Sequence, residues 1–378
     1  MGKYLNTGVP RFPGRQDSLY VDKTALIHYF DSTLNSVNRF SLVAMPPGFG
    51  KTTSLQMLAT YYDKSLDSKD FFVETAIHGL DPQLTNLNKF PVISFSAADF
   101  LTYATKNNDQ EKLHGIVASI QDNLLSDISE EDSDYGIPVG GSLINYLVDV
   151  VSKTGEKFIM LIDEWDYILR EVEDTSVQKS YLDFLRSLFK SKFSKTVFAG
   201  VFMTGIFPVV KTDSESSLND FWEYTPVNPM GMEKYFGFTK GEIRSMCEMS
   251  GINPEKMCAW HGGYILGRQK ELLCPESVIA SIKSGACHSC FSDVPYMNML
   301  KSEVVNFEDS ENLLSVLLSG GVCHVNTEQF LNDLWRINCS SDVLTALIYL
   351  GYLSYDLFEQ KAFIPNCGKK KELAYFLE

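Results

Sequence analysis

Short, nearly continuous apolar runs recur through the first part of the chain, and stretches with helical periodicity separate them. The runs cover residues 40–45, 90–95, 157–162 and 196–204. Strands that are buried on both faces of a parallel sheet have this continuous apolar character. Helices are predicted from residue 51 to about 62, and over 109–128, 142–153 and 176–192. The alternation of strands and helices predicts an α/β fold built on a parallel sheet.

The pattern changes after about residue 228. Thr239 and Glu242 have the spacing of a helix capping box. Residues 341–350 predict a helix with a serine N-cap, and residues 352–355 and 362–364 predict the two strands of a hairpin. We therefore expect a core over residues 1–228, a helical lid over 229–300 and a winged-helix-like module over 301–378.

Charge and hydropathy exclude several classes of protein. The sequence has 33 Lys and Arg residues against 48 Asp and Glu residues, a formal net charge of −15. Proteins that coat nucleic acid through bulk charge are basic, so this class is excluded, although a local basic groove is not. No apolar stretch reaches the roughly 20 residues of a membrane-spanning helix, and we see no apolar leader. We expect a cytoplasmic protein with reduced cysteines.

Cys287 and Cys290 form a C-x-x-C pair that has two interpretations. The spacing can supply two zinc ligands, with Cys274, His261 or Cys323 to complete the site. No second C-x-x-C or H-x-H pair matches it, which favours ordinary thiols.

The strongest motif is the glycine-rich turn between the first apolar run and the helix that follows it. Its residues are Pro47, Gly48, Phe49, Gly50, Lys51, Thr52 and Thr53. Glycines let backbone N–H groups surround phosphates, and the helix N-terminus favours an anion. Lys51 would reach the β- and γ-phosphates, and the Thr52 hydroxyl would bind Mg²⁺. Met45 replaces the first glycine of the G-x-x-x-x-G-K-[ST] pattern, so a simple strand-to-helix turn is the alternative.

A second motif ends the apolar run at residues 157–162. Asp163 and Glu164 stand at the carboxyl end of this predicted strand, where ligand sites of α/β proteins lie. Asp163 would hold Mg²⁺ through its water shell, and Glu164 would polarise the attacking water as general base. Acidic residues commonly end strands, so this motif depends on the glycine-rich turn that precedes it in the chain. Together the two motifs predict a nucleotide site.

The remaining candidates are polar residues on neighbouring elements. Thr204 ends the next apolar run, in the place of a polar γ-phosphate sensor or of an ordinary strand-end threonine. Arg186 is the candidate arginine finger, offered from a neighbouring subunit, with Arg170 second and a solvated helix arginine as the alternative. Asp166 either supports the site from behind or caps the next helix.

Further stretches accompany these motifs. They are Tyr20–Thr24, Ile162–Asp166, Phe202–Pro208, Tyr235–Thr239, Leu350–Leu353 and Ile364–Asn366. With the glycine-rich turn they resemble the bacterial AAA-ATPase-like proteins, which often carry a PD-(D/E)XK nuclease-like domain at the C-terminus. The resemblance implies a P-loop core of the ASCE type and ATP as the nucleotide. It also implies that Tyr20, Asp22 and Lys23 pack near the nucleotide base.

The sequence departs from the family pattern in two places. Pro47 and Gly48 stand where the family usually has two arginines, and Thr52 replaces a serine that would bind Mg²⁺ in the same way. The sequence stops about a dozen residues after Asn366, where the nuclease-like domain would begin, so we do not expect nuclease activity.

These observations predict an ATP-binding P-loop NTPase, a slow Mg²⁺-dependent ATPase that drives a conformational change. The alternative is a nucleotide-dependent switch with negligible turnover. A third interpretation is contact with nucleic acid through the C-terminal module, where Lys369, Lys370 and Lys371 form a basic run, although the net charge does not support it. A homo-oligomer and an unidentified protein partner remain open, and we expect no membrane contact.

Overall fold

The computed structural model of the chain describes residues 2–10, 12, 14, 19–105, 110–131, 137, 141–211, 218–289 and 295–377. The chain divides into two compact units. The first unit comprises Met1–Val43, Thr52–Gly205 and Asp213–Glu223, and the second comprises Ala44–Lys51, Ile206–Thr212 and Tyr224–Glu378. The glycine-rich turn thus belongs to the second unit as far as Lys51, and Thr52 continues the chain in the first.

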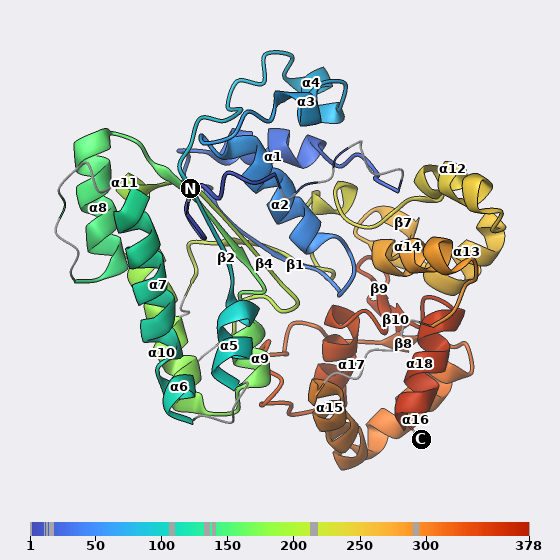
Figure 1. Cartoon of the computed structure of the whole chain (residues 1–378). Coiled ribbons are helices and arrows are strands. Elements are labelled where there is room, and N and C mark those ends of the chain that lie inside the picture. The colour runs from blue at the N-terminus through green and yellow to red at the C-terminus, as the bar shows by residue number, and fades with distance from the viewer. Residues whose placement is uncertain are drawn as a thin grey trace. The chain divides into compact units, whose positions relative to one another are not determined.

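The first unit is built on a five-stranded sheet in the order β2-β3-β4-β1-β5 (Figure 1). The strands are β1 (Phe40–Ala44), β2 (Val92–Ser96), β3 (Phe158–Asp163), β4 (Phe198–Gly205) and β5 (Trp222–Tyr224). β3 pairs in parallel with both β2 and β4. Every residue of β1 and β4 is buried, which explains their continuous apolar sequence. The predicted α/β fold is confirmed.

The first unit also contains a series of helices. They are α1 (Ala25–Thr33), α2 (Lys51–Tyr62), α3 (Lys69–Phe72), α4 (Ala76–Leu80), α5 (Ala97–Thr105), α6 (Gln110–His114), α7 (Ile116–Glu131), α8 (Leu143–Thr154), α9 (Tyr167–Glu171), α10 (Thr175–Phe189) and α11 (Ser194–Val197). α7, α8 and α10 contact one another and run side by side in Figure 1. The strand predicted from Thr196 begins at Phe198 instead, because Thr196 and Val197 close a helical turn onto the carbonyl of Phe193.

The N-terminal segment lies along the free edge of β2. Leu5 pairs with Ile93 in antiparallel fashion. The carboxylate of Asp127 accepts hydrogen bonds from the backbone N–H groups of Lys3, Tyr4 and Leu5 at 2.6, 2.8 and 2.7 Å. This segment therefore acts as a short additional edge strand that α7 holds in place.

The second unit contains the segments that the sequence predicts as a lid and a C-terminal module. Its elements before residue 290 are η3 (Met232–Lys234), α12 (Lys240–Ser250), α13 (Pro254–His261), β6 (Tyr264–Leu266), β7 (Gln269–Leu272) and α14 (Pro275–Ser284). The predicted capping box forms, with Thr239 and Glu242 each bonded to the other's backbone, and Gly251 ends α12 in the left-handed conformation. The antiparallel β6–β7 hairpin was not predicted, because strands of three and four residues give little pattern.

The C-terminal module is a helix followed by a hairpin, as predicted. Its elements are α15 (Pro295–Asn306), α16 (Glu308–Leu318), β8 (Cys323–His324), α17 (Ser340–Tyr349), β9 (Ser354–Asp356), β10 (Lys361–Phe363) and α18 (Cys367–Leu377). β8, β10 and β9 form an antiparallel sheet in that order. α17 begins at Ser340, one residue earlier than predicted, and its residues Asp342–Tyr349 are all buried. The predicted serine N-cap is wrong, because Cys339 is the N-cap residue and its side chain makes no cap hydrogen bond. The module is winged-helix-like.

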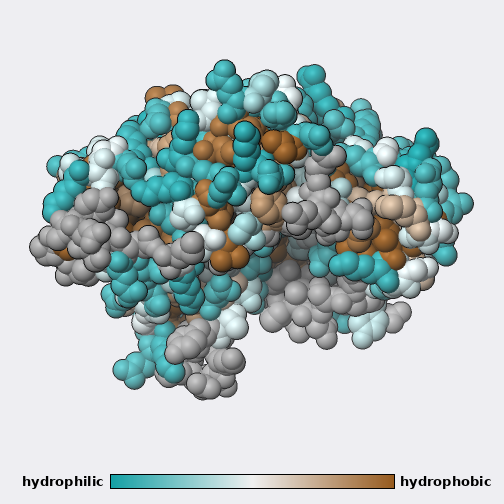
Figure 2. Space-filling view, turned by 45° about the horizontal axis from the view of Figure 1, so that its top comes forward, coloured by the Kyte–Doolittle hydropathy of each residue, from teal (hydrophilic) through white to brown (hydrophobic). Residues whose placement is uncertain are grey.

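Figure 2 shows hydrophilic side chains over most of the coloured surface of one face, with smaller hydrophobic patches between them. Within the described ranges, no helix combines the length and the apolar character that crossing a membrane requires.

Candidate functional site

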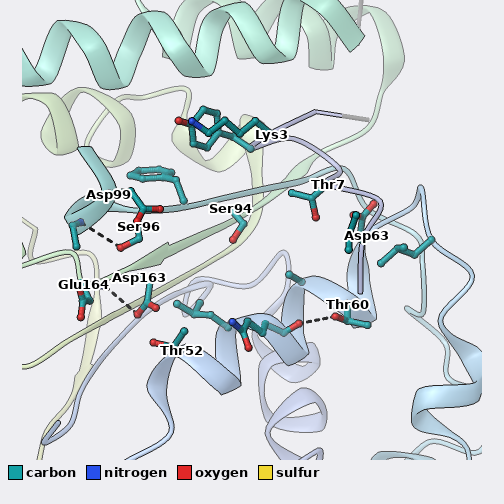
Figure 3. A pocket seen from close by; sticks show the side chains of 18 residues that line it. Lys3, Thr7, Thr52, Thr60, Asp63, Ser94, Ser96, Asp99, Asp163 and Glu164 are labelled. Carbon is teal, nitrogen blue, oxygen red and sulfur yellow. Dashed lines mark hydrogen bonds between the residues drawn. The ribbon is translucent and has the colours of Figure 1, made fainter. Parts of the chain in front are cut away.

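A pocket of about 390 Å³ opens in the first unit, between α2, the carboxyl ends of β2 and β3, and the N-terminal segment (Figure 3). Thr52, Asp163 and Glu164 line one end of it, and Thr60 and Asp63 line the other (Figure 3). The pocket therefore brings together three residues that the sequence assigns to metal binding and water activation.

Carboxylates dominate the charge of the described lining. Asp63, Asp99, Asp163 and Glu164 face a pocket in which Lys3 is the single lysine. Oxygen-rich, negatively charged surroundings favour a hard divalent cation. The charge of this pocket is therefore compatible with the Mg²⁺ that the sequence motifs predict.

Asp163 is held in place by its neighbours on the sheet. Ile162 of β3 pairs with Met203 of β4. The next residue of each strand, Asp163 and Thr204, therefore lie side by side at the carboxyl ends of the two strands. The Thr204 hydroxyl donates to Asp163 Oδ1 at 2.6 Å, and the backbone N–H of Glu164 donates to the same oxygen at 3.1 Å. Both hydrogen bonds fix Oδ1, so Oδ2 is the oxygen that can serve a metal or a metal-bound water.

Glu164 has a left-handed backbone, with φ of +48°. Residues other than glycine adopt this conformation rarely and at a cost of about 1–3 kcal/mol, and such residues cluster at functional sites. The next residue, Trp165, donates its backbone N–H to the carbonyl of Thr204 at 2.9 Å. The chain thus turns sharply after β3, and the turn directs Glu164 to the pocket rather than along the strand.

Thr52 and Thr53 lie on the exposed first turn of α2. The Thr52 hydroxyl and Asp163 Oδ2 are oxygen ligands of the type that Mg²⁺ prefers, and Mg²⁺ keeps several waters beside one or two protein oxygens. The residues present therefore fit the ion. Among the described residues, no group of three or more His, Cys, Asp or Glu side chains forms a metal site.

The glycine-rich turn has the backbone that its sequence requires. Gly48 and Gly50 have φ of +77° and +93°, a region that glycine adopts readily. A Cβ at Gly48 would lie 2.9 Å from Cys274 Sγ and 3.0 Å from Glu276 Cβ, so close packing within the second unit also favours glycine here. Pro47 is exposed and Phe49 is buried.

Lys51 is buried at the end of this turn. Its Nζ donates to the carbonyl oxygens of Met45 and Pro46 at 2.7 and 2.9 Å. The ammonium group therefore lies against the backbone that precedes the turn, and Lys51 is itself the first residue of α2. A buried lysine and a helix N-terminus that follow a glycine turn are the parts of a phosphate-binding loop.

Tyr20, Asp22 and Lys23 do not line the pocket at Thr52. The carboxylate of Asp22 accepts hydrogen bonds from the backbone N–H groups of Thr24 and Ala76 at 2.9 and 2.7 Å, which ties the start of α1 to α4. Burial, followed by the charge of Asp22, raises the pKa of Tyr20. The structure thus gives Asp22 a structural role, and the contact of these residues with a nucleotide base stays a prediction.

The two arginine candidates differ in exposure. Arg170 is buried and pairs with Asp166 at 3.2 Å and with Glu171 at 3.1 Å. Arg186 on α10 is about one-third exposed and pairs with Asp183 at 2.7 Å. Asp166 makes no side-chain cap to α9, so the capping interpretation is wrong, and its carboxylate binds Arg170 instead.

Some features of the site escaped the sequence analysis. Ser96, at the end of β2, is paired with Asp163 in the sheet and lines the pocket; a polar residue that ends a buried strand was the available signal. Lys3 lines the pocket from the N-terminal segment, and no local pattern indicated it. The proposed zinc pair cannot be placed, because Cys290 lies outside the described residues.

Comparison with solved structures gives distant similarities. The chain is similar to the ORC2 protein of Aeropyrum pernix in its ADPNP and ADP complexes, with 11% identity, 97% of each chain covered and a TM-score of 0.36. For the ORC1 protein of Aeropyrum pernix in complex with DNA, the identity is 11%, the coverage 96% of this chain and 95% of that chain, and the TM-score 0.29. For PCH-2 of C. elegans, the identity is 11%, the coverage 87% of this chain and 68% of that chain, and the TM-score 0.24. No curated protein matches the sequence.

A family model gives the closer assignment. The model described as "Predicted AAA-ATPase" matches residues 13–214, more than half of the chain. The matched range contains the glycine-rich turn, the Asp163–Glu164 pair and Thr204. The chain therefore belongs to the predicted AAA-ATPase family, and it is a P-loop protein of that family.

Proposed function

We propose that the chain binds ATP with Mg²⁺ and hydrolyses it slowly, and that the cycle drives a conformational change. The observation that carries this proposal is the joint placement of Thr52, Asp163 and Glu164 at one end of the pocket. The family supports nucleotide use, and the geometry supports the division of roles among these three side chains.

The glycine-rich turn would hold the phosphates. Its left-handed glycines let backbone N–H groups face an anion, and the helix N-terminus after Lys51 contributes a positive electrostatic end. The ammonium of Lys51 would exchange the carbonyls of Met45 and Pro46 for phosphate oxygens. The chain has a formal net charge of −15, so these groups would have to offset most of the electrostatic repulsion between the protein and a polyphosphate.

Glu164 would act as the general base. A water oxygen forms a bond to the γ-phosphorus, the bond from that phosphorus to the β–γ bridging oxygen breaks, and the water proton passes to the Glu164 carboxylate. When bound, Mg²⁺ supplies charge neutralisation on the β- and γ-phosphate oxygens. Thr52 and Asp163 would hold that ion, and Thr204 would act through Asp163 by fixing its Oδ1.

Arg186 would supply the arginine finger to a neighbouring copy. Its pair with Asp183 is a partly exposed ion pair of the kind worth about 0–1 kcal/mol, so it can be exchanged for another partner. Arg170 is less suited, because it is buried between two carboxylates. Slow turnover by the isolated chain follows from this arrangement.

The alternative is a nucleotide switch with negligible turnover. Phosphate release with ATP and Mg²⁺, measured at increasing chain concentration, separates the two. We expect turnover that rises with concentration and falls in Arg186→Ala. No release at any concentration would leave the switch as the better account.

Contact with nucleic acid is not favoured by the C-terminal module. α17, the helix before the hairpin, has residues 342–349 buried. Lys369 pairs with Glu372 at 2.7 Å and lies 4.8 Å above the centre of the Tyr352 ring. The basic run thus has a structural role for at least one of its three lysines.

A further inference from the structure

Tyr264 contacts the glycine-rich turn directly. It is the first residue of β6 and is 3% exposed, and its ring meets the ring of Phe49 edge to face with centroids 5.0 Å apart. Phe49 stands between Gly48 and Gly50 and is 2% exposed. The Phe49 side chain, at the centre of the turn, therefore packs against the ring of Tyr264.

The other end of Tyr264 reaches the C-terminal module. Its hydroxyl donates to the carbonyl of Gly351 at 2.8 Å, in the turn that follows α17. The neighbouring residue, Ile265, donates its backbone N–H to Ser354 Oγ of β9 at 2.8 Å. β6 thus lies between the glycine-rich turn and the hairpin of the module, and bonds to the module at two points.

Pro46, the residue directly before the glycine-rich turn, also contacts the module. A Cβ at Gly351 would lie 2.9 Å from Cβ of Pro46, so only glycine fits against this proline. The carbonyl of Pro46 is one of the two that hold Lys51. When the Lys51 ammonium exchanges these carbonyls for phosphate oxygens, Pro46 loses a charged donor next to Gly351.

The lid fixes the carbonyl side of the turn. The backbone N–H of Glu276 donates to the carbonyl of Gly48 at 3.2 Å, and the Cys274 thiol lies 3.7 Å from the same oxygen. The carbonyl of Gly48 therefore points to residues 274–276 and not to a phosphate.

We propose that Tyr264 is a positioning residue for nucleotide binding, which holds the glycine-rich turn through Phe49 and transmits its rearrangement to the Gly351 turn of the C-terminal module. This inference rests on the proposed function, since it presupposes that the turn binds a nucleotide. The ring and the hydroxyl have separate tasks: the ring supports the turn, and the hydroxyl carries the change to the module.

Two substitutions separate these tasks. Tyr264→Phe keeps the ring and removes the bond to Gly351, whereas Tyr264→Leu removes both. Tyr355→Phe is the control, because Tyr355 is a buried tyrosine of β9 in the C-terminal module and is not placed against the glycine-rich turn. For each full-length chain we would measure the Kd for a nonhydrolysable ATP analogue with Mg²⁺, and the change in amide hydrogen exchange of residues 351–356 on adding it. Melting temperatures check the folding of each variant.

We expect analogue binding to protect or expose the amides of residues 351–356 in the unmodified chain and in Tyr355→Phe. Tyr264→Phe should bind the analogue within about twofold of the unmodified chain but lose this response. Tyr264→Leu should bind about threefold to tenfold more weakly, the range expected for the loss of an edge-to-face ring pair. If Tyr264→Leu does not fold, Tyr264→Phe alone decides the question.

Two failures are distinguishable. An unmodified chain that binds no analogue overturns the proposed function together with the inference that rests on it. If the unmodified chain binds and Tyr264→Phe keeps the full exchange response at residues 351–356, the transmission is refuted while the proposed function stands.

Discussion

The hydroxyl of Thr204 donates a hydrogen bond to Asp163 Oδ1 at 2.6 Å. Asp163 is the last residue of β3 and Thr204 the last but one of β4, and the register of these parallel strands brings the two together. Thr204 is fully buried and does not line the described pocket, so its contact is with the carboxylate and not with the pocket space. In this arrangement Thr204 orients Asp163 through Oδ1, and under the proposed function Oδ2 would serve the Mg²⁺ ion.

Thr204→Val should weaken the dependence on Mg²⁺ specifically. Valine matches threonine in shape but cannot donate to Asp163, and a hydrogen bond to a charged group contributes about 1.5–3 kcal/mol. We expect the Mg²⁺ concentration for half-maximal analogue binding to rise about tenfold, with Thr204→Ser close to the unmodified chain. A Mg²⁺ titration of analogue binding measures this. Equal titrations for the valine and serine variants would mean that the hydrogen bond does not position Asp163.

Glu164→Gln should block turnover and leave nucleotide binding intact. Glutamine keeps the size of the side chain but cannot accept the water proton, and general-base catalysis contributes typically about 10²–10⁴-fold. We expect phosphate release to fall by at least about 100-fold while the Kd for the analogue with Mg²⁺ stays within about twofold. Glu173→Gln, at an exposed position shortly after α9, is the control. Retained phosphate release in Glu164→Gln would remove Glu164 as the base.

Much of the fold was predictable, because parallel strands buried on both faces leave continuous apolar runs. β1, β3 and the helix after the glycine-rich turn lie where the sequence places them. The β6–β7 hairpin was missed because neither strand is long enough to show a period. The predicted division at residues 228 and 300 stays a prediction.

The candidate site was predictable only in its local parts. Lys51 and Thr52 follow from one motif and Asp163 and Glu164 from a second, and each motif spans only a few consecutive residues. The bond from Thr204 to Asp163 depends on strand register, and the support of Phe49 by Tyr264 joins residues more than two hundred positions apart. No local periodicity encodes such contacts. The left-handed backbone of Glu164 was likewise hidden, because glutamate gives no signal for it.

Asp127→Asn should release the N-terminal segment from α7. The carboxylate accepts three backbone N–H groups, and charge-assisted hydrogen bonds are about twice as strong as neutral ones. We expect amide exchange at residues 3–5 to accelerate at least about tenfold, and amide exchange in the neighbouring strand β2 to change less. Asp122→Asn, on an exposed position of the same helix, is the control and should leave these amides unchanged. Unaltered exchange in Asp127→Asn would show that the sheet edge alone holds the segment.

His261 should make stability depend on pH. It is 5% exposed, with Nε2 2.7 Å from Ser281 Oγ. Burial, followed by the charges of His288 and Lys369, lowers the pKa of His261 to about 4. A histidine in the unfolded chain has a pKa of about 6.5. Between about pH 6.5 and pH 4 the unfolded chain therefore binds a proton at His261 that the folded chain does not bind. The free energy of unfolding should therefore fall as the pH decreases from about 6.5 towards 4, by at most about 1.4 kcal/mol per pH unit from this residue.

Melting temperatures of the unmodified chain and of His261→Gln, between about pH 7 and about pH 5, test this dependence. The variant should lose less stability on acidification. His324→Gln, at an exposed histidine, should follow the unmodified chain. If the melting temperatures of the unmodified chain and of His261→Gln fall equally on acidification, a group other than His261 causes the loss of stability at low pH.

Equilibrium binding of a nonhydrolysable ATP analogue with Mg²⁺ tests the central claim most directly. The unmodified chain and Lys179→Ala, an exposed lysine on α10, should bind alike. Lys51→Ala should bind at least about 30-fold more weakly, because losing one partner of a buried charged pair costs about 2–5 kcal/mol. If Lys51→Ala binds the analogue as tightly as the unmodified chain, the glycine-rich turn is not the phosphate site and the proposed function is wrong.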